Sequence, residues 1–165
     1  IESLIPCLFE QGKTPFLLVA DRITDVRNLG ALARTAECAG VDAIVVPHHE
    51  TAMIHADAIK TSAGALHRIA VCRSLNLKAS LMYMKESGLS LVAVCEKGSE
   101  TYTSVPFTGP LALILGSEEN GITPAFLRMA DHICRIPMLG EIASLNVSVA
   151  GGIMMYEVVR QRSLF

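Results

Sequence analysis

The apolar positions of this chain fall into short continuous runs, separated by longer stretches in which apolar residues recur at helical spacing. Residues 43–46 and 89–95 are runs of the first kind, which are typical of parallel strands buried on both faces. Residues 76–87 are of the second kind and end before Gly88, a residue that favours a helix C-terminus. The sequence thus predicts strands over residues 16–20, 43–46, 68–72, 89–95, 111–115 and 132–136, and helices over 29–39, 52–59, 76–87, 123–130 and 145–160.

Strands and helices alternate along the whole chain, and this order favours a three-layer α/β domain with a mostly parallel sheet. The length of 165 residues is ordinary for one domain. No apolar run approaches the ~20 residues that a membrane helix requires. We therefore expect a single α/β domain with no membrane partner.

The segment 136–150 combines a strand end, a Pro/Gly loop and a helix start with small polar side chains, among them Ser144 and Asn146. The unpaired backbone N–H groups of a helix N-terminus can hold a polar ligand, whereas an ordinary N-cap needs no ligand. We expect the loop to end at Ser144. We also expect Leu145 and Val149 to pack inward. Taken alone, the segment leaves both roles open.

Two further loops follow predicted strands. Residues 116–121 form a glycine loop that carries Glu118, and Asn28 precedes a helix of small residues that contains Arg34. In open α/β sheets, ligands bind beyond the carboxyl ends of the strands. One cleft could therefore collect all three loops.

Three common motifs are excluded. A phosphate-binding P-loop needs Lys and Ser or Thr after its second glycine, where this chain has Ile122. The sequence also contains neither the G-x-G-x-x-G dinucleotide motif nor the G-x-S-x-G serine motif. The remaining site, rich in apolar backbone and poor in metal ligands, suits a ligand that is part apolar and part polar.

Charge and cysteine usage narrow the class of protein further. The net charge of −2 gives no global basic footprint, so any contact with RNA must be local or assisted. Five widely spaced cysteines, mostly in apolar stretches, favour buried thiols in a reducing compartment, the cytoplasm. His48, His49 and His55 are the one group with metal-ligand spacing, and we expect no metal there because no acidic or thiolate partner completes it.

In this order and spacing, the three loops resemble the motifs of the SpoU (TrmH) family of RNA ribose 2′-O-methyltransferases, part of the SPOUT superfamily. The most specific match is Ile136-Pro137-Met138 followed by residues 144–150, then Asn28-x-Gly30 with Arg34-Thr35-Ala36, and last Gly116-x-Glu118. The resemblance covers residues 16–162. Residues 55–65 and 156–162 resemble the branch that methylates a guanosine of large-subunit ribosomal RNA.

The resemblance implies a C-terminal trefoil knot, S-adenosylmethionine as cofactor and RNA as substrate. It also implies a homodimer in which side chains of the motif that contains Asn28 and Arg34, the first along the chain, approach the neighbouring subunit's cofactor. The implied cofactor-binding residues are Leu115, Gly116, Ile136, Met138, Leu145 and Asn146. The implied catalytic residues are Arg34, Asn28, Glu118, Ser144 and Asn146. Two positions depart from the family pattern: Arg27 replaces a usual proline and Glu119 a frequent glycine.

Methyl transfer to a ribose 2′-hydroxyl requires loss of its proton, and only Glu118 and Arg34 among these residues are ionisable. Arginine is a poor base because its pKa exceeds ~12. Arg34 therefore either clamps phosphate and orients the 2′-oxygen, or acts as the base, as the resemblance favours. Glu118 either holds Arg34 or shapes its own loop, while Asn28, Ser144 and Asn146 position the substrate and the third loop.

The resemblance also bears on domain organisation. We expect residues 1–15 to be a linker or a remnant of a missing N-terminal RNA-binding domain, and residues 16–165 to be the catalytic domain. Two alternatives stay open: a methyltransferase that acts on transfer RNA, and a non-catalytic module for RNA binding or ribosome assembly.

Overall fold

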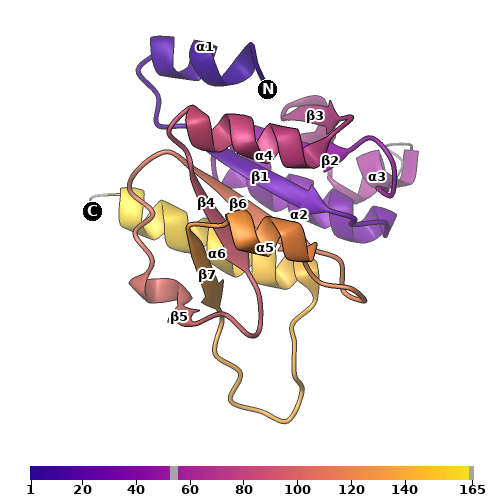
Figure 1. Ribbon diagram of the computed structural model, residues 1–165. Helices are drawn as coiled ribbons and strands as arrows, with labels where there is room; N and C mark the ends of the chain where they lie inside the picture. Colours follow the sequence, from indigo (N-terminus) through magenta and orange to yellow (C-terminus); the bar gives the residue numbers. More distant parts are fainter. Residues whose placement is uncertain (53–55, 164–165) are drawn as a thin grey trace.

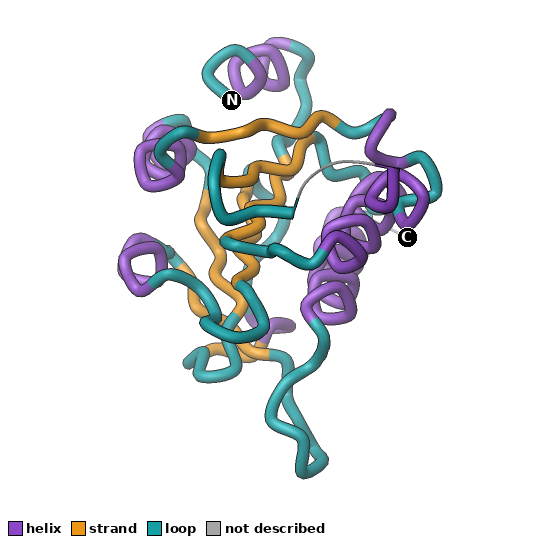
Figure 2. Tube along the Cα trace, turned by 90° about the vertical axis from the view of Figure 1, so that its right-hand side faces the viewer, coloured by secondary structure: helices purple, strands orange, loops and turns teal. Residues whose placement is uncertain are grey.

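The computed structural model describes residues 1–52 and 56–163, and shows a parallel sheet between two layers of helices (Figures 1 and 2). Seven strands lie in the order β3-β2-β1-β6-β4-β7-β5, and every neighbouring pair is parallel. The strands are β1 (Phe16–Asp21), β2 (Ala43–Pro47), β3 (Ala70–Ser74), β4 (Ser90–Val94), β5 (Glu100–Thr101), β6 (Leu111–Gly116) and β7 (His132–Arg135). The predicted parallel α/β architecture is confirmed.

Successive strand residues point to opposite faces, and each face is covered by its own helices. Leu18 of β1 belongs to a cluster with Leu32 and Met155, from α2 and α6. Leu17 belongs to a second cluster with Leu81 and Phe126, from α4 and α5. The helices are α1 (Leu4–Glu10), α2 (Val26–Cys38), α3 (Ala56–Thr61), α4 (Leu77–Glu86), α5 (Pro124–Met129) and α6 (Val147–Arg162), with short 3₁₀ turns η1 (Ala65–His67) and η2 (Tyr102–Ser104).

The element boundaries differ from the prediction in instructive places. The helix predicted over 29–39 begins three residues earlier, because the Asp25 carboxylate accepts hydrogen bonds from the backbone N–H groups of Arg27 and Asn28. The strand predicted over 68–72 lies two residues later, at Ala70–Ser74. The sequence did not predict α1, which packs its buried Ile5 against the α4 face of the sheet, nor the short strand β5.

Helices α2 and α6 approach each other closely enough to exclude side chains at the contact. A Cβ atom added to Gly151 of α6 would lie 2.4 Å from Leu32 of α2 and 2.8 Å from Leu115 of β6. A larger residue at position 151 would therefore require both leucine side chains to move. Because both helices also begin at the carboxyl end of the sheet, the packing brings their first turns together.

The end of α6 is held against the opposite end of the sheet by one arginine. The Arg162 guanidinium donates to the backbone carbonyls of Phe107, Thr14, Pro15 and Gly109, at 2.6 to 3.4 Å. It also lies 5.2 Å from the centre of the Phe16 ring. Burial lowers the pKa of Arg162, although arginine stays charged at any ordinary pH. This residue fastens the last helix to the loop that precedes β1.

Candidate active site

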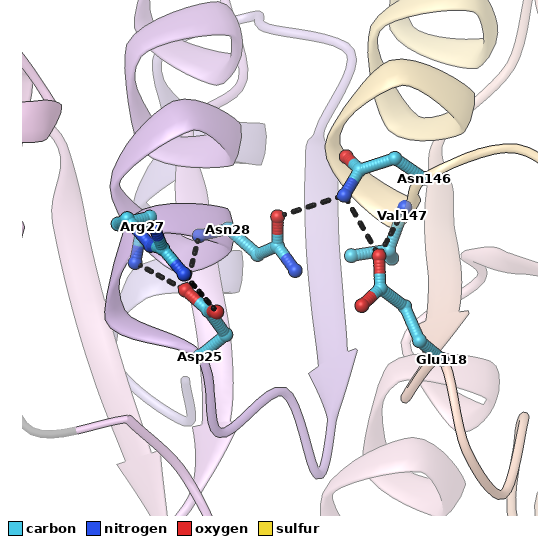
Figure 3. A network of polar contacts seen from close by, with 6 residues as sticks. All are labelled: Asp25, Arg27, Asn28, Glu118, Asn146 and Val147. Carbon is cyan, nitrogen blue, oxygen red and sulfur yellow. Dashed lines mark hydrogen bonds and ion pairs between the residues drawn. The ribbon is translucent and has the colours of Figure 1, made fainter.

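Asn28, Glu118 and Asn146, one residue from each predicted loop, meet in a single polar network (Figure 3). Asn146 Nδ2 donates to Asn28 Oδ1 at 3.0 Å and to Glu118 Oε1 at 2.7 Å. The same Glu118 oxygen accepts from the Val147 backbone N–H at 3.4 Å. Residues up to 118 positions apart are thus joined at the carboxyl end of the sheet, as the sequence predicted.

Asn146 is also the N-cap of α6, since its Oδ1 accepts from the backbone N–H groups of Ser148 at 2.9 Å and Val149 at 3.4 Å. The prediction that the loop ends and the helix starts at Ser144 was therefore wrong. Ser144 lies in the preceding loop and is exposed. Val149 was also misplaced, because the register of α6 buries Val147 and leaves Val149 50% exposed.

The loop that carries Glu118 is tightly folded on itself. A Cβ atom on Gly116 would lie 2.2 Å from the backbone of Gly121, so only glycine fits at the end of β6. The buried carboxylate of Asp21 accepts from the Thr123 backbone N–H at 2.7 Å, and Arg22 donates to the Gly121 carbonyl at 3.3 Å. The end of β1 thus anchors the far end of the Glu118 loop.

Two hollows flank Glu118. The first, of about 440 Å³, lies beyond β4 and β6, and we call it the β4–β6 hollow. Five of the residues that the resemblance implied for cofactor binding line it: Leu115, Gly116, Ile136, Met138 and Leu145. Ser144 lines it as well, whereas Asn146 does not. The predicted cofactor residues are therefore brought together around one space.

The second hollow, of about 600 Å³, lies beyond β1, and we call it the β1–β6 hollow. Asn28, Asp25 and Arg22 line one side, and Glu118 and Val147 line both this hollow and the β4–β6 hollow. Hydrogen bonds from the backbone N–H groups of Asn28 and Arg27 hold the pKa of Asp25 below its ordinary value. A ligand on each side would meet at Glu118.

The loop after β4 was missed by the sequence analysis. Cys95, Glu96 and Lys97 line the β4–β6 hollow. Their signal was present in the sequence, because they directly follow a predicted strand and the rule that placed the other loops applies to them equally.

Arg34 is not part of the network. It is exposed on α2, two turns beyond Asn28, and the described residues provide no hydrogen bond or ion pair to its guanidinium. Glu118 contacts Asn146 and not Arg34. Within one chain, Glu118 therefore holds the start of α6.

The predicted metal-ligand group and the predicted buried thiols can be compared with the described residues. Residues 1–52 and 56–163 contain no group of three or more His, Cys, Asp or Glu side chains that could hold a metal ion. His55, one member of the predicted histidine group, lies outside the described residues. Cys7 and Cys38 are exposed, so the prediction of buried thiols was wrong for these two, which lie on the outer faces of α1 and α2. Cys134 is buried, and burial raises the pKa of its thiol to about 12.

No helix within the described part of the chain is both long and apolar enough to cross a membrane.

The profile of the SpoU rRNA Methylase family matches residues 15–156. The chain is 40% identical over 163 residues to a Yersinia pestis protein named 23S rRNA (guanosine-2′-O-)-methyltransferase RlmB, with 99% of this chain and 66% of that protein covered. The Escherichia coli K12 protein of the same name is 38% identical, with 98% and 67% covered.

Solved structures agree with the sequence comparisons. The SpoU methyltransferase AviRb from Streptomyces viridochromogenes, in complex with AdoMet, matches with a TM-score of 0.83 and 28% identity over 91% of this chain and 59% of that one. The TrmH/SpoU tRNA modifying enzyme of A. aeolicus matches with a TM-score of 0.82 and 31% identity, over 98% and 83%. The chain spans about two thirds of the length of the curated relatives that it matches. From its motifs to its fold, this chain belongs to the SpoU rRNA methylase family.

Proposed function

We propose that this chain transfers a methyl group from S-adenosylmethionine to a ribose 2′-hydroxyl of structured RNA. The ribose we propose is that of a guanosine in large-subunit ribosomal RNA. The observation that carries the proposal is the meeting of Asn28, Glu118 and Asn146 between two hollows. In-line methyl transfer needs two ligands whose reacting atoms meet, and the two hollows share Glu118 and Val147 as lining residues. The names of the relatives supply the substrate class.

The β4–β6 hollow fits the cofactor in size and chemistry. Its volume of about 440 Å³ lies in the range of small-molecule sites. Leu115, Ile136, Met138 and Leu145 provide an apolar lining, and the exposed Glu96 lies at its edge. We expect these residues to hold S-adenosylmethionine, whose sulfonium supplies an activated methyl group when it is bound.

The chain's own residues would act on the RNA side. Asn28, held by Asn146, lines the β1–β6 hollow and can hydrogen-bond a ribose hydroxyl. Glu118 fixes the N-terminus of α6 at the place where the two hollows adjoin. Arg34 is too far around α2 to join this network, so we assign it to the active site of a partner subunit, as a clamp for phosphate and the 2′-oxygen or as the base.

A homodimer is part of this proposal. Val149 and Tyr156 are 50% and 51% exposed and lie seven residues, or two turns, apart on α6. This exposed apolar stripe supports a symmetric contact between two copies. A dimer of this kind would bring helix α2 of one subunit, with Arg34, toward the hollows of the other.

We further propose that the C-terminal part of the chain forms the family's trefoil knot, that residues 1–15 are a linker to an N-terminal RNA-binding domain or a remnant of it, and that the protein acts in the cytoplasm. The length of the curated relatives supports a further domain. The net charge of −2 supports it too, since it leaves this chain little general affinity for phosphate. Linking the two domains would raise the concentration of RNA at the active site.

Transfer RNA is a second candidate substrate, because a structural relative over 98% of this chain is named a tRNA modifying enzyme. One experiment separates the alternatives. The purified chain is incubated with labelled S-adenosylmethionine and separate pools of unmodified ribosomal and transfer RNA, and the 2′-O-methyl positions are mapped. We expect label in a large-subunit guanosine. Label only in transfer RNA would move the substrate, and no transfer to either pool would favour a non-catalytic RNA-binding module.

A further inference from the structure

Cations are concentrated in one continuous segment of an otherwise acidic chain. Between Asp57 and Glu86 the sequence contains five Lys and Arg residues and no acidic residue, although the whole chain has a net charge of −2. Lys85 pairs with Asp131 at 2.7 Å. Among the described residues, the other four, Lys60, Arg68, Arg73 and Lys78, have no ion-pair partner, and all four are exposed.

Three of these cations lie together at one edge of the sheet. Lys60 is at the end of α3, Arg68 directly follows η1, and Arg73 is on β3, the edge strand. The turn η1 contacts both α3 and β3. Val71 packs in the cluster on the α2 face, and Arg73, two residues further along the strand, shares that face. We call Lys60, Arg68 and Arg73 the α3–β3 cationic surface.

This surface is continuous with the active site. Lys60 and Arg27 line a hollow of about 680 Å³ between the first turn of α2 and helix α3. Asp25 lines both this hollow and the β1–β6 hollow that contains Asn28. Within the hollow Arg27 pairs with Asp25 at 3.5 Å, and Lys60 is the lining cation that also belongs to the α3–β3 cationic surface.

We propose that the α3–β3 cationic surface binds backbone phosphates of the RNA that flank the nucleotide in the β1–β6 hollow. The inference rests on the proposed function, because it assigns a path to that function's substrate. Exposed Lys and Arg side chains without an ion-pair partner among the described residues are free to contact the phosphates of a nucleic-acid backbone. The outer edge of β3 adds backbone N–H groups that no strand pairs, which are further donors for phosphate oxygens.

A purely structural role gives a different expectation. Charged side chains on edge strands also prevent strands of different molecules from pairing. If this were the whole role of Arg73, its removal would promote aggregation and leave RNA binding unchanged. The two roles therefore separate by experiment.

The test compares two double variants that remove equal charge. Arg68→Gln with Arg73→Gln alters the surface, and Lys13→Gln with Lys78→Gln is the control, since Lys13 precedes β1 and Lys78 lies on α4, over the opposite face. Binding of a fluorescent, unmodified large-subunit RNA transcript is measured by anisotropy at several salt concentrations. Methyl transfer is measured in parallel, with the KM for RNA and for S-adenosylmethionine.

For the surface variant we expect RNA affinity to fall roughly tenfold, and the slope of log affinity against log salt to shrink by about 1.4 to 1.8, which corresponds to two lost phosphate contacts. The KM for RNA should rise by a similar factor, while kcat and the KM for S-adenosylmethionine stay unchanged. Equal RNA affinity and salt slope in the two double variants would overturn the inference. If the parent binds RNA but transfers no methyl group, the proposed function fails, and the binding comparison still decides the role of the surface.

Discussion

Replacing Asn146 by aspartate separates its two roles. The Oδ1 atom caps α6, and the Nδ2 atom ties Asn28 and Glu118 together. Aspartate caps a helix about as well as asparagine does, so Asn146→Asp keeps the helix start. It removes the amide donor of both bonds and places a second carboxylate beside Glu118.

The size of the effect follows from the contacts. The bond to the Glu118 carboxylate, at 2.7 Å, is worth about 1.5–3 kcal/mol, and the neutral bond to Asn28, at 3.0 Å, about 0.5–1.5 kcal/mol. Repulsion between the carboxylates adds about 1 kcal/mol in this exposed position. These contributions add to about 3–5.5 kcal/mol, and expression of the lower value at the reacting centre would already lower turnover by about 10²-fold.

The assay follows methyl transfer and thermal unfolding of Asn146→Asp beside Asn146→Ala, which loses the cap as well. We expect both variants to lose turnover, but the alanine variant to be less stable by about 1 kcal/mol, the usual contribution of a cap. Parent-like turnover of Asn146→Asp at pH 8 would refute the role of the network.

Three further outcomes are expected. Arg34→Ala should lower turnover about 10²-fold or more with unchanged thermal stability and cofactor affinity, and Arg34→Lys should rescue it poorly because an ammonium lacks the guanidinium fork; an active alanine variant in the transfer assay would contradict the assignment. Gly116→Val should be destabilised by at least about 1–3 kcal/mol in denaturant unfolding, since its Cβ meets the Gly121 backbone, and normal stability would show that this loop yields easily. The Arg160 hydrogen bond lowers the pKa of Glu157 below its ordinary 4.5, so its contribution to stability is present above pH 4.5 and is lost as pH falls through the lowered pKa; Glu157→Gln should flatten unfolding curves measured between pH 5 and pH 3, and an unchanged profile would exclude this pair as a source of acid sensitivity.

The strands and the meeting of the loops could be predicted because each depends on a local pattern. Leu17 and Leu18 are both fully buried, on opposite faces of β1, and the run from Phe16 to Ala20 is apolar at every position. The parallel order then places every loop after a strand at the same edge. The sheet and the location of the site follow from these two facts.

The details that could not be predicted depend on contacts between distant residues. Ser144 and Asn146 are both good caps, and the choice between them is made by Glu118, a residue 28 positions away from Asn146. Helix α1 has a short apolar face and no side-chain cap at Ser3, so little in the sequence marks it.

The placement of Arg34 could have been predicted. Six residues at about 100° each turn it roughly 120° around the helix from Asn28, so the two side chains cannot share one network on α2. The motif alone hides this, because it presents both residues as parts of one signature.

The network that joins residues 28, 118 and 146 sets an order of events while the protein is being made. A ribosome adds about 5–20 residues per second, so Asn28 waits roughly 6–24 s for its partner 118 positions later. Before Asn146 emerges, Glu118 lacks the residue to which it binds at the start of α6. Arg162, which fastens the end of that helix near β1, is made later still. Nascent chains stalled before residue 146 should therefore fail to retain labelled S-adenosylmethionine, and retention by such chains would contradict this order. On the proposed function, the newly made chain would then stay inactive until its last helix has folded, and incomplete chains would bind neither S-adenosylmethionine nor RNA.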